Sequence, residues 1–153
     1  MSKEKELITL GWREWVRLPD LGIDAIKVKV DTGARTSAIH AFELETLVED
    51  GKERVAFSIH PIQKDDATVV KCVADVLERR VVTDSGGHKE ERIVIATTLA
   101  IGKHSWPIEA TLTARDNMLF RMLLGRTAIK GRAQVNPARS YLVGKRKKKK
   151  RGS

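Results

Sequence analysis

The amino-acid sequence predicts an all-β fold, a sandwich or a barrel, with at most one short helix. Short segments rich in Val, Ile and Thr alternate with turn residues along the chain, which is the pattern of strands. Asp50-Gly51 and Gly102-Lys103 separate successive segments, and an Asp-Gly pair accepts the positive φ angles of a tight hairpin. Evenly spaced short strands joined by such turns are typical of a sandwich or a closed barrel.

Each expected strand follows from its local pattern. Residues 7–16 form an apolar run that a glycine interrupts, and residues 26–30 alternate apolar and basic side chains, as a half-buried strand does. Residues 42–48 and 54–59 flank a predicted hairpin turn at residues 50–51. The other segments of strand composition are residues 69–82, 91–100, 99–101, 106–112 and 119–124. A single helical turn is expected after Gly125, over residues 126–130.

Positive charge is concentrated at the end of the sequence. The chain has 153 residues and a net charge of +9, and residues 145–151 contribute seven positive charges. Residues 1–144 therefore carry only +2 and are expected to form one domain. Because a block of like charges repels itself, residues 145–153 are expected to be a disordered basic tail. This tail either tethers the protein to RNA, the ribosome or an acidic protein, or only improves solubility.

The sequence favours a cytoplasmic protein without membrane insertion. Residues 1–6 are charged and lack the apolar segment of a signal peptide. No apolar run approaches the ~20 residues that span a bilayer. Cys72 is the only cysteine, so no disulfide can form within the chain.

An Asp-Thr-Gly-Ala sequence directly follows the strand predicted at residues 26–30. Such a sequence is weak evidence alone, because it also occurs in ordinary turns. Here the preceding strand places Asp31 at a strand end, and the small residues that follow, Ala34 and residues 36–38, permit close backbone approach. Asp31 is therefore a candidate catalytic carboxylate.

Two later segments have compositions that suit a substrate cleft. Ser85-Gly86-Gly87 lies in the loop between two long predicted strands and has the composition of a mobile flap; the alternative is an ordinary surface hairpin. Near the end of the domain, three apolar residues at 122–124 are followed by Gly125 and Arg126.

In this order, the three features resemble retropepsin-like aspartic proteases over residues 26–129. The resemblance implies a closed acid-protease barrel with a flap hairpin. The residue roles that it implies are catalytic Asp31, Thr32 and Gly33, substrate-binding Ala34, Arg35, Ser85, Gly86 and Gly87, and structural support from Gly125 and Arg126.

Peptide hydrolysis at such a site needs two carboxylates that share one proton. The chain has a single Asp-Thr-Gly sequence, so we expect a homodimer in which Asp31 meets its own copy on a two-fold axis. Two carboxylates that close cannot both ionise cheaply, so one keeps its proton. The pair then activates water and protonates the leaving amine. Thr32 would link the two loops across the axis, and Gly33 would allow the tight turn behind the carboxylate.

A narrower resemblance is to a bacterial family usually labelled "ATP-dependent zinc protease", although its pattern is retropepsin-like. It rests on residues 11–16 (Gly-Trp-Arg-Glu-Trp-Val), 30–41 and 122–127, within a match over residues 7–143. Its members are linked to ATP-grasp ligases that add glutamates to the C-terminus of a small-subunit ribosomal protein. The resemblance therefore implies an aspartic endopeptidase that acts on acidic or glutamylated protein tails. The rival interpretation is a catalytically silent β-barrel module that binds RNA or ribosomes through its basic tail.

The residues do not support the zinc or the ATP of that label, and we expect neither a metal nor a cofactor. The nitrogen and sulfur candidates for zinc are His40, His60, His88, His104 and Cys72. They are scattered, and none belongs to a His-Glu-x-x-His or paired-cysteine pattern. The chain also lacks the Gly-x-x-x-x-Gly-Lys sequence of a phosphate-binding loop.

The other residue types associated with chemistry or stacking are interpreted as structural. Cys72 lies in an apolar segment and is expected in the core. Aromatic residues make up only 5% of the chain, which is poor support for a protein that stacks bases. Trp12, Trp15 and Trp106 are therefore expected in the core or at a dimer interface.

Arg35 predicts the charge of the substrate. Retropepsins commonly have an acidic residue at this position, and it pairs with the arginine that matches Arg126. Here the charge is reversed, so Arg126 needs another partner, for which Glu14 is the candidate. Two arginines near a cleft suit an acidic substrate side chain, because a partly desolvated Arg–carboxylate contact contributes about 1.5–3 kcal/mol.

Overall fold

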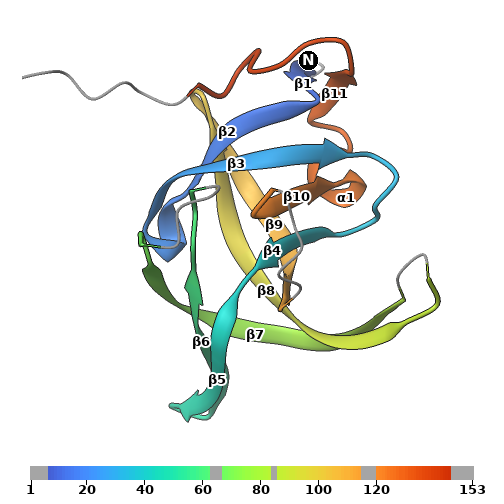
Figure 1. Ribbon diagram of the computed structural model, residues 1–153. Coiled ribbons are helices and arrows are strands. Elements are labelled where there is room, and N and C mark those ends of the chain that lie inside the picture. The colour runs from blue at the N-terminus through green and yellow to red at the C-terminus, as the bar shows by residue number, and fades with distance from the viewer. Residues whose placement is uncertain (1–6, 63–66, 84–85, 115–119, 146–153) are drawn as a thin grey trace, which may run out of the picture.

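The computed structural model describes residues 7–62, 67–83, 86–114 and 120–145. These residues form an all-β structure with one turn of α-helix and one 3-10 turn, so the predicted fold class is confirmed (Figure 1). The strands are β1 (Ile8–Gly11), β2 (Arg13–Leu18), β3 (Ile23–Asp31), β4 (Ser37–His40), β5 (Phe42–Glu49), β6 (Lys52–Ile59), β7 (Val70–Thr83), β8 (Lys89–Ile101), β9 (His104–Thr113), β10 (Met122–Gly125) and β11 (Ala133–Asn136). The helical turns are η1 (Pro19–Leu21) and α1 (Arg126–Ile129).

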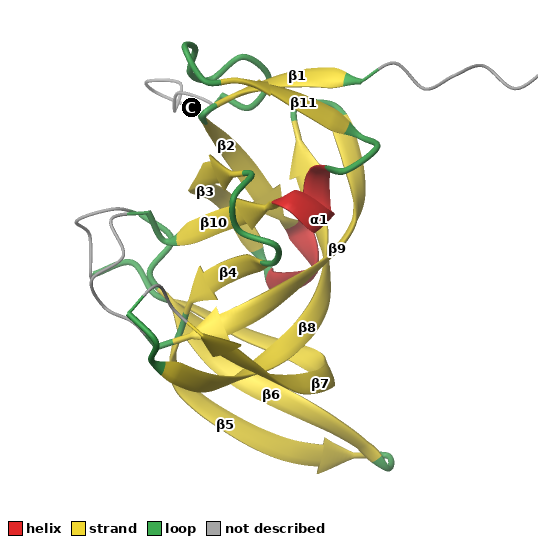
Figure 2. Cartoon of the chain, turned by 90° about the vertical axis from the view of Figure 1, so that its right-hand side faces the viewer, coloured by secondary structure: helices red, strands yellow, loops and turns green. Residues whose placement is uncertain are grey.

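Most of the strands belong to a single sheet that closes on itself. Its order is β2-β3-β10-β4-β9-β8-β7-β6-β5. An additional pairing, between Arg17 of β2 and Ala100 of β8, joins the first strand of this order to the sixth. The six strands β2, β3, β10, β4, β9 and β8 therefore form a closed ring, as in a barrel. β7, β6 and β5 extend the sheet beyond it, at the bottom of Figures 1 and 2.

β10 is inserted between two strands that are consecutive in the sequence. It pairs in parallel with β3 and antiparallel with β4. The connection from Asp31 to Ser37 therefore passes across the end of β10, and Gly125 lies opposite Asp31. This crossing brings together two segments that are far apart in the sequence, and it positions the candidate site.

The single strand predicted over residues 7–16 is two strands in different sheets. β1 pairs in parallel with β11 in a small separate sheet, whereas β2 enters the barrel beside β3. Trp12, between them, donates its backbone N–H to the Arg139 carbonyl at 2.8 Å and accepts the Val30 N–H at 2.8 Å. These contacts turn the chain from one sheet into the other. β11 was not predicted, because its sequence Ala-Gln-Val-Asn has little strand character.

The predicted hairpin turns are confirmed. β5 and β6 are joined by Asp50 and Gly51, with φ angles of 52° and 77°. Gly102, with a φ of 57°, occupies the turn between β8 and β9.

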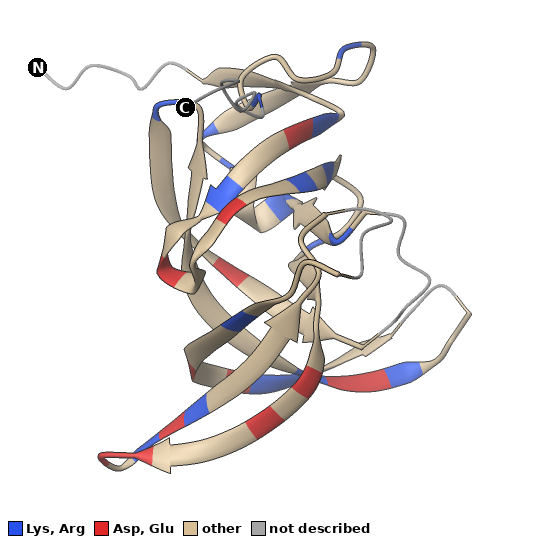
Figure 3. Cartoon of the chain, turned by 60° about the vertical axis from the view of Figure 1, so that its left-hand side comes forward, with Lys and Arg blue, Asp and Glu red and all other residues tan. Residues whose placement is uncertain are grey.

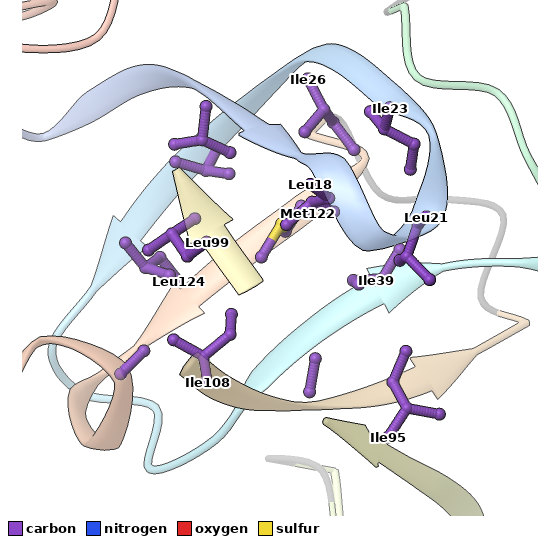
Figure 4. Close-up of a cluster of buried hydrophobic side chains, with 14 of the residues drawn as sticks. Leu18, Leu21, Ile23, Ile26, Ile39, Ile95, Leu99, Ile108, Met122 and Leu124 are labelled. Atoms are coloured by element: carbon purple, nitrogen blue, oxygen red, sulfur yellow. The ribbon is translucent and has the colours of Figure 1, made fainter. Parts of the chain in front are cut away.

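The barrel interior is filled by side chains that point inward from every wall. On β3, Ile26, Val28 and Val30 are buried, and residues 27 and 29 between them are not. Leu99 from β8 and Met122 and Leu124 from β10 meet them in the centre (Figure 4). The alternation of buried and less buried residues along β3 is the period-2 pattern of a half-buried strand.

Among the described residues, no helix has the length and apolar character needed to cross a membrane.

Candidate active site

Asp31 is the last residue of β3 and is half-buried. Gly33 donates its backbone N–H to the Oδ1 atom of Asp31 at 3.1 Å, and Ala34 donates its N–H to the Asp31 carbonyl at 3.1 Å. A side chain on residue 33 would begin only 3.3 Å from Oδ1, so glycine leaves this carboxylate oxygen uncrowded. Thr32 and Gly33 are both exposed. The carboxylate is therefore held at a defined position on an accessible loop.

Gly125 allows β10 to end directly beneath this loop. A Cβ at this position would lie 2.5 Å from the backbone carbon of Thr36 and 2.7 Å from its oxygen, which real contacts do not permit. The Gly125 N–H donates to the Ser37 hydroxyl at 3.0 Å, and the Ser37 carbonyl accepts from the Thr111 hydroxyl at 3.2 Å. The loop after Asp31 is thus joined to β10 and to β9.

The first residues of α1 hold the same loop by main-chain hydrogen bonds. The Arg126 N–H donates to the backbone carbonyl of Ala34 at 2.8 Å, and the Thr127 N–H donates to the backbone carbonyl of Arg35 at 3.1 Å. The Arg126 guanidinium reaches the Thr32 carbonyl at 3.5 Å. Arg126 thus contacts the loop through both its backbone and its side chain.

Glu14 is not the partner of Arg126 that the sequence led us to consider. Its carboxylate is fully buried and accepts a backbone N–H from Gly11 at 2.6 Å. It also accepts the N–H groups of three consecutive C-terminal residues, 142–144, at 2.7–3.1 Å. Glu14 therefore fastens the C-terminal segment to the start of β2 and has a structural role.

Arg35 lies on the exposed side of the loop. Among the described residues, its side chain has neither a hydrogen bond nor an ion pair with another group. The sequence placed Arg35 and Arg126 near one cleft. The structure puts Arg35 on the loop that follows Asp31 and Arg126 at the start of α1, where its guanidinium reaches the Thr32 carbonyl of that loop. Both arginines are exposed at the surface.

The hairpin of β7 and β8 corresponds to the predicted flap. Gly86 and Gly87 are exposed at its outer end, and Gly87 has a φ of 83°; Ser85 lies outside the described residues. The hairpin extends from the barrel on the same side as the β3–β4 connection (Figure 1). Arg80 of β7 lies close to the loop that follows Asp31, because its guanidinium is 3.4 Å from the Thr36 hydroxyl.

Ion pairs fix the base of this hairpin on both faces. Arg80 contacts Glu78 and lies 3.7 Å from Glu109 of β9. Arg79 points the other way and binds Glu53 of β6 with two hydrogen bonds of 2.7 and 2.6 Å. The hydrogen bonds from Arg79 lower the pKa of Glu53 below its usual value. The hairpin is thus connected to β6 on one face and to the Asp31 loop on the other.

The candidate metal ligands do not converge in the part of the chain that the structure describes. Within it, no group of three or more His, Cys, Asp or Glu side chains could hold a metal ion. His40 is buried, with Nδ1 3.5 Å from the Arg121 guanidinium. His60 stacks on Phe42 with ring centroids 4.4 Å apart.

Cys72 is a core residue, as predicted. It is 3% exposed, and its thiol lies 3.4 Å from the Leu21 carbonyl. Burial raises its pKa to about 11, so the thiol stays protonated at neutral pH. Trp106 is also buried and donates its indole N–H to the Ala128 carbonyl at 2.8 Å. Trp12 and Trp15 are half-buried.

Sequence reasoning missed three residues that shape the site. The Ser37 hydroxyl accepts the Gly125 N–H, the Ser37 carbonyl accepts from the Thr111 hydroxyl, and Arg80 joins the hairpin to the loop. All three bonds connect segments that are distant in the sequence. Only the outward position of Arg80 on an alternating strand offered a signal.

Comparison with known proteins agrees with this arrangement. The profile of the RimB-like family, described as "Retropepsin-like aspartic endopeptidase RimB", matches residues 9–146. The crystal structure of Lpg0085, a protein of unknown function from Legionella pneumophila subsp. pneumophila str. Philadelphia 1, superposes with a TM-score of 0.75. It covers 90% of this chain and 98% of that chain at 22% identity, so the likeness concerns the fold alone.

Curated relatives carry a different name and are much longer. A protein of Desulfotalea psychrophila (strain LSv54 / DSM 12343), named "Probable alpha-L-glutamate ligase", is 45% identical over 144 residues, which are 94% of this chain and 31% of the relative. A protein of the same name from Parasynechococcus marenigrum (strain WH8102) is 46% identical over 137 residues, covering 90% of this chain and 29% of the relative. The chain thus spans about a third of the length of these relatives.

The family profile extends over almost the whole chain and includes the Asp31 loop, β10 and α1. Its description names an aspartic endopeptidase and mentions neither zinc nor ATP. The chain belongs to the RimB-like family of retropepsin-like aspartic endopeptidases.

Proposed function

We propose that the protein is an aspartic endopeptidase whose active form is a homodimer and whose substrates are acidic or glutamylated protein tails. One observation carries the proposal: the carboxylate of Asp31 ends a barrel strand on an exposed loop that Gly33, Gly125 and Arg126 hold in place. The chain also belongs to a family named for this chemistry.

The position of Asp31 suits a shared dyad. Its Oδ1 atom accepts the Gly33 N–H, which fixes the plane of the carboxyl group and leaves Oδ2 for a second carboxyl group and a water. In the dimer, one carboxylate takes a proton from the water as the water oxygen bonds to the peptide carbon. The other carboxyl group gives its proton to the carbonyl oxygen. When the C–N bond breaks, the nitrogen leaves with a proton from the dyad.

Two observations support an acidic substrate. Arg35 carries a positive charge on the loop that follows Asp31, and the Arg126 guanidinium reaches the same loop from α1. In addition, the relatives whose names refer to a glutamate ligase contain a segment similar to this chain. A peptidase that acts beside such a ligase would shorten the glutamate tails that the ligase makes, such as one on the C-terminus of a modified ribosomal protein.

A mixing experiment tests the dyad. Purified protein is expected to cleave a glutamate-rich peptide, and Asp31→Asn to abolish cleavage without unfolding. When wild-type and Asp31→Asn chains are mixed in equal amounts and allowed to exchange, only dimers of two wild-type chains are active. Total activity should then fall to about a quarter of that of an equal total amount of protein that is all wild type.

The other outcomes have clear meanings. A fall to about a half would show that each chain acts alone, and would exclude the shared dyad. Full activity of Asp31→Asn would exclude the aspartic mechanism. If wild type cleaves no acidic peptide and instead binds RNA through its tail with strong salt dependence, the silent binding module is correct.

A further inference from the structure

The Gly-Trp-Arg-Glu-Trp-Val segment, residues 11–16, lies outside the site proposed for the peptidase. In β2, Glu14 and Val16 point into the barrel, whereas Arg13 and Trp15 point outward. Arg13 lies directly opposite Lys29 of the neighbouring β3, and Trp15 lies opposite Lys27. Half of this segment therefore builds the core, and the other half forms the outer surface of β2 and β3.

Aromatic rings and cations alternate on this outer surface. The Arg13 guanidinium lies 4.7 Å from the centroid of the Trp12 ring and 5.0 Å from that of Tyr141. The Lys27 ammonium lies 5.3 Å from the Trp15 ring and 6.0 Å from Tyr141. Each cation is thus flanked by two rings, which hold it in place by cation–π attraction. We call Trp12, Arg13, Trp15, Lys27, Lys29 and Tyr141 the basic aromatic face.

Tyr141 reaches this face because Glu14 holds the C-terminal segment against β2. The Tyr141 N–H donates to the Arg13 carbonyl at 3.0 Å, and the Trp15 N–H donates to the Gly144 carbonyl at 3.1 Å. The φ angle of Tyr141 is 54°, in the left-handed region that a bulky residue seldom adopts. A strained backbone that places a ring between two cations is a feature that function can explain.

The exposed charges of residues 13–17 and 25–29 are of one sign, whereas Asp24, near the start of β3, is acidic and exposed. In the paired segments 13–17 and 25–29 the basic residues are Arg13, Arg17, Lys27 and Lys29, and the acidic residue, Glu14, is buried. Figure 3 shows Lys and Arg together with acidic positions on these upper strands, and further acidic residues along β5 at the opposite end. The run of seven cations begins at Lys145, directly after Gly144, which is bound to Trp15.

We infer that the basic aromatic face is a docking surface for single-stranded RNA. The ordered cations suit the phosphate backbone, and the rings of Trp15 and Tyr141 suit unstacked bases. An acidic polypeptide would use the cations but gains little from the rings. The surface therefore fits RNA better than an acidic protein, and its role does not depend on the chemistry of Asp31.

The test measures binding of the full chain to a fluorescein-labelled oligouridylate of about fifteen nucleotides. Fluorescence anisotropy gives the affinity at each of several salt concentrations. The variant Arg13→Gln/Lys27→Gln/Lys29→Gln is expected to bind about tenfold or more weakly at physiological salt. Its salt dependence should be shallower by about two in the slope of log K against log salt. The matched control is Lys52→Gln/Lys71→Gln/Lys89→Gln, which removes three exposed cations from β6, β7 and β8. It should bind within about twofold of wild type.

Two further measurements separate the face from the tail and from other polyanions. Tyr141→Leu keeps every charge and should weaken RNA binding at least about fivefold. Polyglutamate of equal charge should compete at least about tenfold less well than the RNA. Arg13 also binds Ser140 at 3.2 Å, so Lys27→Gln/Lys29→Gln replaces the triple variant if that variant is less stable.

Three results would overturn the inference. If the control loses as much affinity as the face variant, binding is diffuse attraction to net charge. If the face variants bind RNA as wild type does, the tail acts alone. If polyglutamate competes as well as RNA and Tyr141→Leu changes nothing, the surface binds acidic polypeptides instead.

Discussion

Two carboxylates on neighbouring strands, Glu14 of β2 and Asp31 of β3, have opposite surroundings. Glu14 is fully buried and accepts four backbone N–H groups from the two ends of the domain. Asp31 is half-buried and accepts one, from Gly33. The two strands pair along most of their length, so the difference comes from the segments that cover them.

The difference separates a structural carboxylate from one with capacity for chemistry. A carboxylate has about four sites for accepting hydrogen bonds, and at Glu14 these sites are filled by the backbone. At Asp31 one oxygen is anchored while the rest of the group faces an exposed loop. A catalytic carboxyl group needs this combination, because it must be fixed in position and still able to exchange a proton with water.

Exchanging each acid for its amide should separate these roles most strongly. We expect Asp31→Asn to reduce peptide hydrolysis by at least about a thousandfold and to change the free energy of unfolding by less than about 0.5 kcal/mol. We expect Glu14→Gln to lower the free energy of unfolding by roughly 3 kcal/mol, because an amide N–H₂ would face buried N–H donors. Per folded molecule, Glu14→Gln should hydrolyse peptides as wild type does.

Urea unfolding and steady-state hydrolysis of one glutamate-rich peptide measure both quantities. A variant at Glu14 that is as stable as wild type would show that the four hydrogen bonds do not hold the C-terminal segment. An unstable Asp31→Asn would assign Asp31 to the fold as well.

Cys72 extends the comparison to a buried group with potential reactivity. Burial raises its pKa to about 11, and the thiolate is the form that reacts with alkylating agents. Modification by iodoacetamide near pH 8 should therefore be at least about a hundredfold slower than that of an unfolded cysteine. Glu14→Gln should accelerate it by the factor by which it raises the unfolded population, about tenfold for each ~1.4 kcal/mol of lost stability, and Asp31→Asn should not. Rapid modification of folded wild type, followed by mass spectrometry, would contradict the buried position.

The parts of the fold that sequence could predict are those with local signals. The β5–β6 hairpin was readable because Asp50 and Gly51 accept positive φ angles, and both have them. The strand into Asp31 was readable from the alternation of Val28, Lys29 and Val30. Short-range patterns of this kind need only the residues themselves.

The remaining features depend on contacts between distant segments. Nothing in the sequence of β10 indicates that it lies between β3 and β4. Glu14 is an acid in an apolar strand, and its partners are backbone groups at the other end of the domain, which have no side-chain signature. The division of the first predicted strand also depends on a long-range contact. β1 is separated from β2 because it pairs with β11, at the other end of the domain.

Arg35 tests whether the open surroundings of Asp31 also select the substrate. It is exposed on the Asp31 loop, and the Arg126 guanidinium is bound to the Thr32 carbonyl of the same loop. A substrate carboxylate between these two cations would relieve their repulsion and form a charge-assisted contact. We expect Arg35→Glu to lower kcat/KM for a glutamate-rich peptide by at least about tenfold, and to leave a glutamine-rich peptide of the same length within about twofold. Lys52→Glu makes the same change of charge at the β5–β6 turn, away from the loop, and should leave both peptides unaffected. Equal losses on both peptides with Arg35→Glu would mean that Arg35 supports the loop rather than the substrate. In that case the proposed preference for acidic tails would lose the support that it takes from Arg35.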